Sequence, residues 1–190
     1  CDAVSALSYK GALHAAPVAA LRVLAGPAPG VHVVDVVHEG NAVESREEAA
    51  AVVAIVRDQL GRAWLDPSVS DEPRPLTAAD VIVVAPYNAQ VDLLRRTLDA
   101  AGLPETRVGT VDRFQGQEAV IAVVSLTASS ADDAPRGIDF VLQRNRINVA
   151  ISRAQWAAYV VHSPRIADAL PYRADGLAQL SGFLRLTGRG

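Results

Sequence analysis

Apolar residues lie along the chain in five short runs that are bounded by turn-forming or charged residues. The runs span residues 31–37, 81–85, 107–111, 119–126 and 157–162. Val, Ile and Ala dominate four of them, in which most positions are apolar instead of alternating with polar ones; residues 107–111 are more mixed. This pattern is typical of strands that are buried on both faces of a parallel sheet.

Between these runs, apolar residues recur every three or four positions, which predicts amphipathic helices. The clearest helix is predicted over residues 45–60, with Ser45 as N-cap and Glu47 and Glu48 in the first turn, where the helix dipole favours acids. Further helices are predicted over residues 88–101, 144–154 and 175–186. Polar stretches that are rich in turn formers predict loops over residues 66–76 and 128–141.

Strands that alternate with helices predict a three-layer α/β domain, in which a mostly parallel sheet carries helices on both faces. We assign this domain to residues 31–190. Residues 1–30 are predicted to form a lead-in, with a short helix over 15–24 and a linker of glycine and proline at 26–30.

Composition narrows the class of protein. The 190 residues suit one globular domain, with 50% hydrophobic and 21% charged residues. The formal net charge of −3 provides no global basic field, so nucleic-acid contacts would have to be local. A single cysteine, Cys1, excludes a disulfide framework within the chain. The sequence contains no run of about 18 apolar residues, which argues against a membrane-spanning helix. We expect a cytoplasmic protein, and the lack of methionine suggests a piece excised from a longer chain.

Residues 108–153 carry most of the chemistry-bearing side chains. The segment opens with V-G-T-V-D-R-F-Q-G-Q-E and closes with R-N-R-I-N-V-A-I-S-R-A. Gln115, Gly116 and Glu118 precede a buried strand, beside a polar turn. Arginine is dense on the otherwise apolar closing helix and suits a phosphate partner, because its planar donor fork matches phosphate oxygens. These arginines are Arg144, Arg146 and Arg153.

These two segments resemble motifs V and VI of superfamily 1 helicases. V-I-V-V-A-P-Y-N-A-Q at residues 81–90 resembles motif IV of the same group. The resemblance is to the Upf1-like branch, which contains the nonsense-mediated-decay helicase and the nuclease-helicase that trims Okazaki flaps. It covers residues 31–165 and implies the second RecA-like motor domain, of the P-loop NTPase type, from a DNA or RNA helicase.

The resemblance also implies roles for individual residues. Arg153 would be the arginine finger, and Glu118 and Gln115 would sense the nucleotide or its hydrolysis. ATP and Mg²⁺ would be held mainly by a first motor domain upstream in the parent chain, and a fused nuclease is a candidate neighbour. The implied nucleotide contacts are Tyr87, Gln90, Gly116, Glu118, Arg146 and Arg153, and the implied contacts to single-stranded DNA or RNA are Thr110, Val111 and Arg144.

Other interpretations of the same residues stay open. Arg153 can end a helix where the dipole favours a cation, and Tyr87 can pack at a strand end. Arg144 and Arg146 can pair with acids of the preceding loop, Asp132 and Asp133. Two residues depart from the helicase pattern. Asn88 follows Tyr87 where some relatives have a charged residue, and Gln155 follows S-R-A where a basic residue is common.

Several motifs are absent from the sequence. There is no G-x-x-x-x-G-K-[ST] phosphate loop and no acidic pair closing an apolar strand, so the chain alone is not expected to be an efficient ATPase. The alternative function is a non-catalytic nucleic-acid-binding or docking module that kept the fold. No G-x-G-x-x-G supports a dinucleotide enzyme. The four histidines lack ligand spacing, so no metal site is expected. Aromatic residues make up only 5%, so phosphate contacts are expected to outweigh base stacking.

Overall fold

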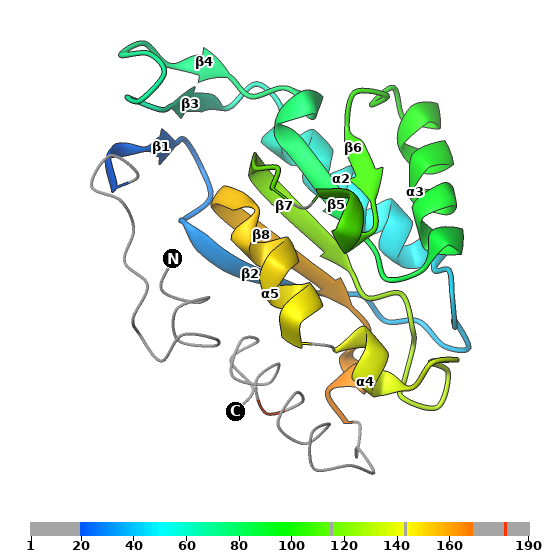
Figure 1. Cartoon of the computed structure of the whole chain (residues 1–190). Coiled ribbons are helices and arrows are strands. Elements are labelled where there is room, and N and C mark those ends of the chain that lie inside the picture. Colours follow the sequence, from blue (N-terminus) through cyan, green and yellow to red (C-terminus); the bar gives the residue numbers. More distant parts are fainter. Residues whose placement is uncertain (1–19, 115, 143, 169–180, 182–190) are drawn as a thin grey trace.

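A five-stranded parallel sheet forms the centre of the molecule (Figure 1). The computed structural model describes residues 20–114, 116–142, 144–168 and 181, without the side chains of 138, 139 and 144–147. The sheet order is β2-β8-β7-β5-β6, and every neighbouring pair is parallel. The strands are β2 (Gly30–Asp35), β5 (Val81–Val84), β6 (Arg107–Gly109), β7 (Ala119–Ser125) and β8 (Ala154–His162).

Helices cover both faces of this sheet (Figure 1). Helices α2 (Arg46–Gln59) and α3 (Asn88–Ala100) pack on one face, against Val81, Val83 and the other strand residues of the same parity. Helix α5 (Arg144–Ser152) packs on the opposite face, where Ala150 contacts the residues that alternate with them, such as Ile82. All seven residues of β7 are buried, because this central strand is covered on both sides. The predicted three-layer α/β fold is confirmed.

Helix α2 begins as its sequence predicts. Ser45 has an extended backbone, and its hydroxyl accepts a hydrogen bond from the backbone N–H of Glu48 at 3.1 Å. This bond satisfies one of the N–H groups that have no partner within the helix. Glu47 and Glu48 lie in the first turn, but their surroundings differ, because Glu47 is exposed and Glu48 is fully buried.

The chain before β2 contains a strand where the sequence predicted the end of a helix. Strand β1 (Val23–Leu24) pairs antiparallel with β3 (Ala63–Leu65), which in turn pairs with β4 (Arg74–Pro75). The helix predicted over 15–24 is therefore wrong at residues 23 and 24, which form β1. Residues 15–19 lie outside the described residues. The domain boundary between residues 30 and 31 stays a prediction, although β1 lies before it and pairs with β3 after it.

Other local differences are small. Strand β8 begins at Ala154, earlier than the predicted residue 157, because Ala154 already pairs with Ala119 of β7. The predicted loop 128–141 ends in the short helix α4 (Ile138–Val141), and 3₁₀ turns η2 (Ala78–Asp80), η3 (Val111–Phe114) and η4 (Pro164–Ile166) connect other elements. The helix predicted over 175–186 lies outside the described residues.

Candidate functional site

The ends of the parallel strands form two opposite edges, and the candidate residues divide between them. Thr110 directly follows β6 at the carboxyl edge, whereas Glu118 directly precedes β7 at the amino edge. Residues 110–118 therefore run from one edge of the sheet to the other, through η3. Strand β7 has seven residues and spans roughly 20 Å, so the two edges are separate sites.

Arg153 lies at the amino edge, immediately after α5. Its Nε donates to the carbonyl of Val149 at 3.1 Å, and its second terminal nitrogen donates to the Ser152 hydroxyl at 3.2 Å. The backbone carbonyl of Arg153 accepts from the N–H of Ala119 at 3.0 Å, which places it beside the start of β7. No carboxylate pairs with Arg153 among the residues that the structure describes. The side chain is only half-buried, so its charge is accessible from this edge.

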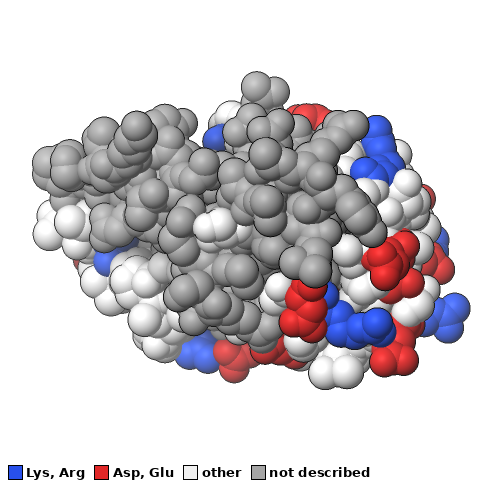
Figure 2. All heavy atoms as spheres, turned by 90° about the horizontal axis from the view of Figure 1, so that it is seen from below, with Lys and Arg blue, Asp and Glu red and all other residues white. Residues whose placement is uncertain are grey.

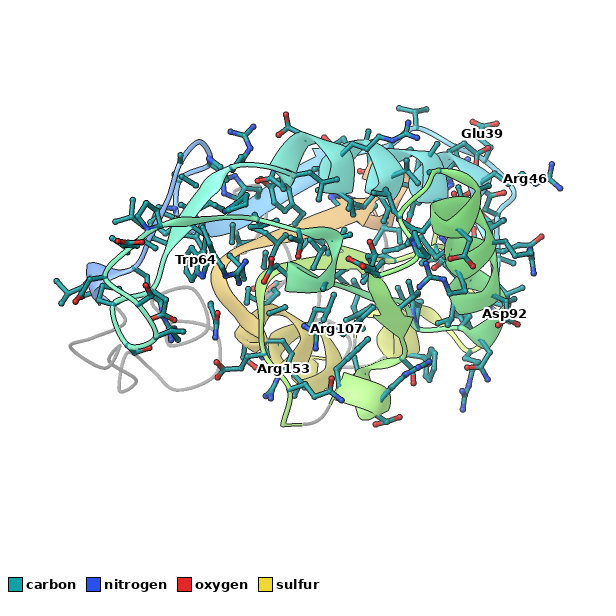
Figure 3. The ribbon with its side chains drawn as sticks, turned by 90° about the horizontal axis from the view of Figure 1, so that it is seen from above. Glu39, Arg46, Trp64, Asp92, Arg107 and Arg153 are labelled. Atoms are coloured by element: carbon teal, nitrogen blue, oxygen red, sulfur yellow. The ribbon has the colours of Figure 1, made fainter. Side chains whose placement is uncertain are left out.

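Glu118 lies in the same group. Its carboxylate accepts from the side-chain amide of Gln155 at 3.1 Å, and its backbone carbonyl accepts from Arg107 at 3.1 Å. Arg107 also donates to the side-chain oxygen of Gln117 at 3.3 Å. Figure 3, which views the molecule from above, labels Arg107 and Arg153 at this edge. Arg107 was not among the predicted site residues. Its position as the first residue of an apolar strand was the available signal, because it places the arginine at an edge of the sheet.

Some predicted residues can be placed only by backbone or not at all. Gln115 lies outside the described residues, and its neighbour Gly116 forms an exposed turn with φ of +78°. Arg144 and Arg146 lie in the first turn of α5, where their side chains are not described. Along the helix axis, Arg144 is ~12 Å from Ser152. The structure therefore places these two arginines toward the carboxyl edge, away from Arg153.

The carboxyl edge contains a cavity of about 450 Å³. It lies between the ends of β5, β6 and β7, the start of α3, and the segment that includes α4. Tyr87, Thr110 and Val111, three of the predicted site residues, line it. The other polar or aromatic lining residues were not among the predicted site residues; they are Asn88, Asp112, Arg136 and Phe140.

Tyr87 was predicted to contact the nucleotide, but it lies beside Thr110 and Val111, which were predicted to contact single-stranded nucleic acid. Its ring is 8% exposed and packs against Phe140, with the ring centroids 5.5 Å apart. The guanidinium of Arg136 covers the Phe140 ring at 4.1 Å from the ring centroid. Tyr87 therefore belongs to the carboxyl-edge cavity and not to the group around Arg153.

Gln90, the other predicted nucleotide contact from this segment, is fully buried in the core. Its side-chain oxygen accepts from the N–H of Ser45 at 2.7 Å. Its amide nitrogen donates to the Ser45 carbonyl at 3.2 Å and to the Ser125 hydroxyl at 3.0 Å. The geometry thus assigns Gln90 to joining α2, α3 and β7, because no part of its amide reaches a surface.

A buried polar network lies beneath the carboxyl edge. Both carboxylate oxygens of Glu48 accept hydrogen bonds, one from His38 at 3.1 Å and the other from the Ser125 hydroxyl and the Thr127 N–H. The second ring nitrogen of His38 contacts the Ser129 hydroxyl at 2.7 Å. Thr127 has φ of +76°, which a threonine rarely adopts. The network fixes the chain that leaves β7.

Charge is mixed over the described surface. In the view of Figure 2, acidic and basic residues alternate around the described margin of the face seen from below. Within the described ranges, no group of three or more His, Cys, Asp or Glu residues could hold a metal ion. No helix in that part of the chain is long and apolar enough to cross a membrane.

Comparison with known proteins identifies the domain type. A family model described as an AAA domain matches residues 2–165. The chain is 42% identical over 78 residues to the DNA polymerase alpha-associated DNA helicase A of Schizosaccharomyces pombe, which covers 41% of the chain and 11% of that protein. It is 38% identical over 91 residues to the DNA-binding protein SMUBP-2 of Mesocricetus auratus, which covers 48% of the chain and 9% of that protein.

A third relative is the human RNA helicase Mov10l1, which is 33% identical over 94 residues. That alignment covers 48% of the chain and 8% of the relative. The chain thus spans about a tenth of the length of the relatives it matches. Since the family model covers most of the chain and these relatives include helicases, the chain belongs to the AAA-domain family typical of the C-terminal region of Upf1-like superfamily 1 helicases, and it is a helicase motor domain.

Proposed function

We propose that the chain is the second motor domain of an ATP-dependent DNA or RNA helicase. In this proposal its amino edge closes on ATP that an upstream RecA-like domain of the same parent chain binds. Its carboxyl edge contacts one strand of nucleic acid. Movement of the two domains with each ATP hydrolysed would step the protein along the strand.

The observation that carries the proposal is the position of Arg153. An arginine finger must be accessible and free of a competing carboxylate. Its side chain must also be held in a defined direction toward the phosphate. Arg153 is half-buried and has two bonds to neutral oxygens, those of Val149 and Ser152. No acid pairs with it in the described part of the chain. Its guanidinium is therefore available to stabilise charge on a phosphoryl group.

The residues around Arg153 fit a triphosphate at the amino edge. Arg107 contributes a second guanidinium, which donates to two neutral oxygens, the side-chain oxygen of Gln117 and the backbone carbonyl of Glu118. The Glu118 carboxylate is held by Gln155, a neutral residue, so it remains exposed for a water or a ribose hydroxyl. When ATP and Mg²⁺ are bound, they supply the reacting phosphoryl group and the metal charge, held mainly by the upstream domain.

The carboxyl edge suits single-stranded nucleic acid, because ligands of open parallel sheets bind outside the carboxyl ends of the β-strands. Thr110 offers a hydroxyl there, and Val111 follows it at the rim of the cavity. Arg144 and Arg146 are proposed to contact the strand backbone from the start of α5. Because residues 110–118 connect both edges, strand contact and nucleotide contact are made by one continuous segment.

ATP turnover tests the proposal. The chain alone and the chain joined to the upstream sequence of its parent are assayed with and without single-stranded DNA and RNA. The joined protein should show strand-stimulated turnover, and the chain alone should show none. Arg153→Ala in the joined protein should reduce turnover by roughly 10³-fold to 10⁵-fold and leave strand binding intact. Arg96→Ala, an exposed arginine on α3, is the matched control and should not change the rate.

Two outcomes contradict the proposal. Unchanged turnover in Arg153→Ala would remove the assigned finger. A joined protein that binds strands but never hydrolyses ATP would favour the alternative function, a nucleic-acid-binding or docking module that kept the helicase fold.

A further inference from the structure

The cavity at the carboxyl edge has the chemistry of a site for a planar, aromatic ligand. Its volume of about 450 Å³ lies within the range of small-molecule pockets. Val84, Leu126 and Val141 provide apolar surface, and the aromatic rings of Tyr87 and Phe140 form one wall. A nucleic-acid base is planar, has an apolar face, and carries polar groups on its edge.

Phe140 already holds a planar group in the structure. The Arg136 guanidinium lies over its ring at 4.1 Å, and Arg136 is exposed while Phe140 is half-buried. A base can replace the guanidinium on this ring, because both are flat and both gain from contact with an aromatic face. The displaced Arg136 would remain at the rim, where the phosphate next to the inserted base would provide its partner.

Asp112 determines which ligands the cavity can accept. Asp112 lines the cavity and is exposed, and no described residue makes a hydrogen bond or ion pair with its carboxylate. A negative charge at this position repels a bare phosphate. The same carboxylate accepts hydrogen bonds from the exocyclic amino group of a base, as acidic residues do with cytosine N4. Thymine and uracil offer no amino group at this edge.

We propose that this cavity receives one base of the bound strand, stacked on Phe140, and that Asp112 favours a base with an amino group over thymine or uracil. The inference rests on the proposed strand-binding function and adds a base-specific grip to it. The cavity lies across the sheet from Arg153, so the base of a nucleotide at the amino edge would not occupy it. The low content of aromatic residues led to the expectation that phosphate contacts dominate; here two of the few aromatic side chains meet in one cavity.

The first test compares strands of twelve deoxycytidines and twelve deoxythymidines at fixed salt, by fluorescence anisotropy with the joined protein. The deoxycytidine strand should bind about fivefold more tightly, which is the lower end for a specific base contact. Asp112→Asn should bring the two affinities together, because the amide can also donate to thymine O4. Asp92→Asn, which removes the same charge from an exposed position on α3, should leave the ratio unchanged.

The second test removes a single base. An abasic site is moved along the deoxycytidine strand, and at one position it should weaken binding roughly tenfold, as loss of one stacked base does. Phe140→Leu keeps an apolar side chain in the core and should make all abasic positions equivalent. Circular dichroism of Phe140→Leu checks that the fold is retained. A second variant, Arg136→Gln, should weaken binding of both DNA strands equally and lower the salt dependence of binding by about one phosphate contact.

The outcomes separate this inference from the function on which it rests. Equal affinities for the two strands in the unchanged protein, together with a flat abasic scan, would overturn the base site and leave strand binding intact. Absence of any strand binding would overturn both. If deoxycytidine monophosphate alone competes as well as the strand and depends on Phe140, the ligand is a free nucleotide and the strand assignment of this cavity is wrong.

Discussion

Replacing Glu48 by alanine is expected to destabilise the domain more than any surface change. Glu48 is fully buried, and its two carboxylate oxygens accept from His38, the Ser125 hydroxyl and the Thr127 N–H. Alanine would leave these three groups buried without their acceptor. It would also leave His38 without the only acid it contacts among the described residues.

The magnitude follows from what is left unpaired. A buried polar group without a partner costs about 1–3 kcal/mol, and Glu48→Ala leaves three such groups, in His38, Ser125 and Thr127. These costs are not fully additive, because the three groups belong to one network, so we expect a loss of about 3–5 kcal/mol. That loss is a large part of a typical unfolding free energy of about 5–15 kcal/mol. Glu48→Gln keeps the side-chain shape and one acceptor, so its loss should be roughly half as large.

Urea unfolding, followed by circular dichroism, measures the effect. With a slope near 2–3 kcal/mol per molar urea, the midpoint of Glu48→Ala should fall by about 1–2 M. Glu44→Ala, an exposed acid just before α2, is the control and should stay within about 0.5 kcal/mol of the unchanged protein. If Glu48→Ala unfolds at the same urea concentration as this control, the network is not a stabilising element and the reasoning fails.

Two further predictions concern Asp80, which pairs with Arg74, and Gly116, which lies in the turn before β7. Burial raises the pKa of Asp80, but hydrogen bonds from Arg74 and from Thr77 outweigh it and hold this pKa below its usual value. The unfolded chain then binds the proton first, so stability is present above about pH 4 and is lost as the pH falls. Urea midpoints measured from pH 6 to pH 2.5 should decline less steeply in Asp80→Asn, and identical slopes would contradict the assignment. Gly116 has φ of +78°, so Gly116→Ala should cost about 1 kcal/mol in urea unfolding and Gly116→Asn less; equal stability of all three would show that the turn can relax.

The order and type of the central elements could be predicted, because each buried strand is a continuous apolar run and each helix has a regular apolar spacing. The small sheet could not, because its strands are two or three residues long and their partners are distant in sequence. Val23 pairs with Leu65, and neither segment has a pattern of its own. Trp64 shows the cause, since it is buried against Trp156, 6.1 Å away between ring centroids, a contact that no local pattern reveals.

The candidate site was predictable only as far as motifs reach. Arg153 and Glu118 come from separate helicase-like motifs, and the structure places both at the amino edge. The sequence did not reveal that Gln90 is buried, because a polar residue at the junction of strand and helix can face the core as easily as a ligand. Asp112 and Arg136 were missed, since the cavity forms only when separate loops meet at the carboxyl edge.

The segment 110–118 gives the two edges a physical connection. Its first residue lines the carboxyl-edge cavity, and its last residue contacts Gln155, two residues after Arg153. Phe114, which is 2% exposed, anchors the middle in the core, and Arg107 closes the loop by donating to the Glu118 carbonyl eleven residues later. Among the described residues of the segment, Phe114 and Glu118 are therefore fixed by contacts with the rest of the domain. In the proposed function, a nucleic-acid strand that displaces Thr110 would also shift Glu118, and this is the coupling that a strand-stimulated ATPase requires.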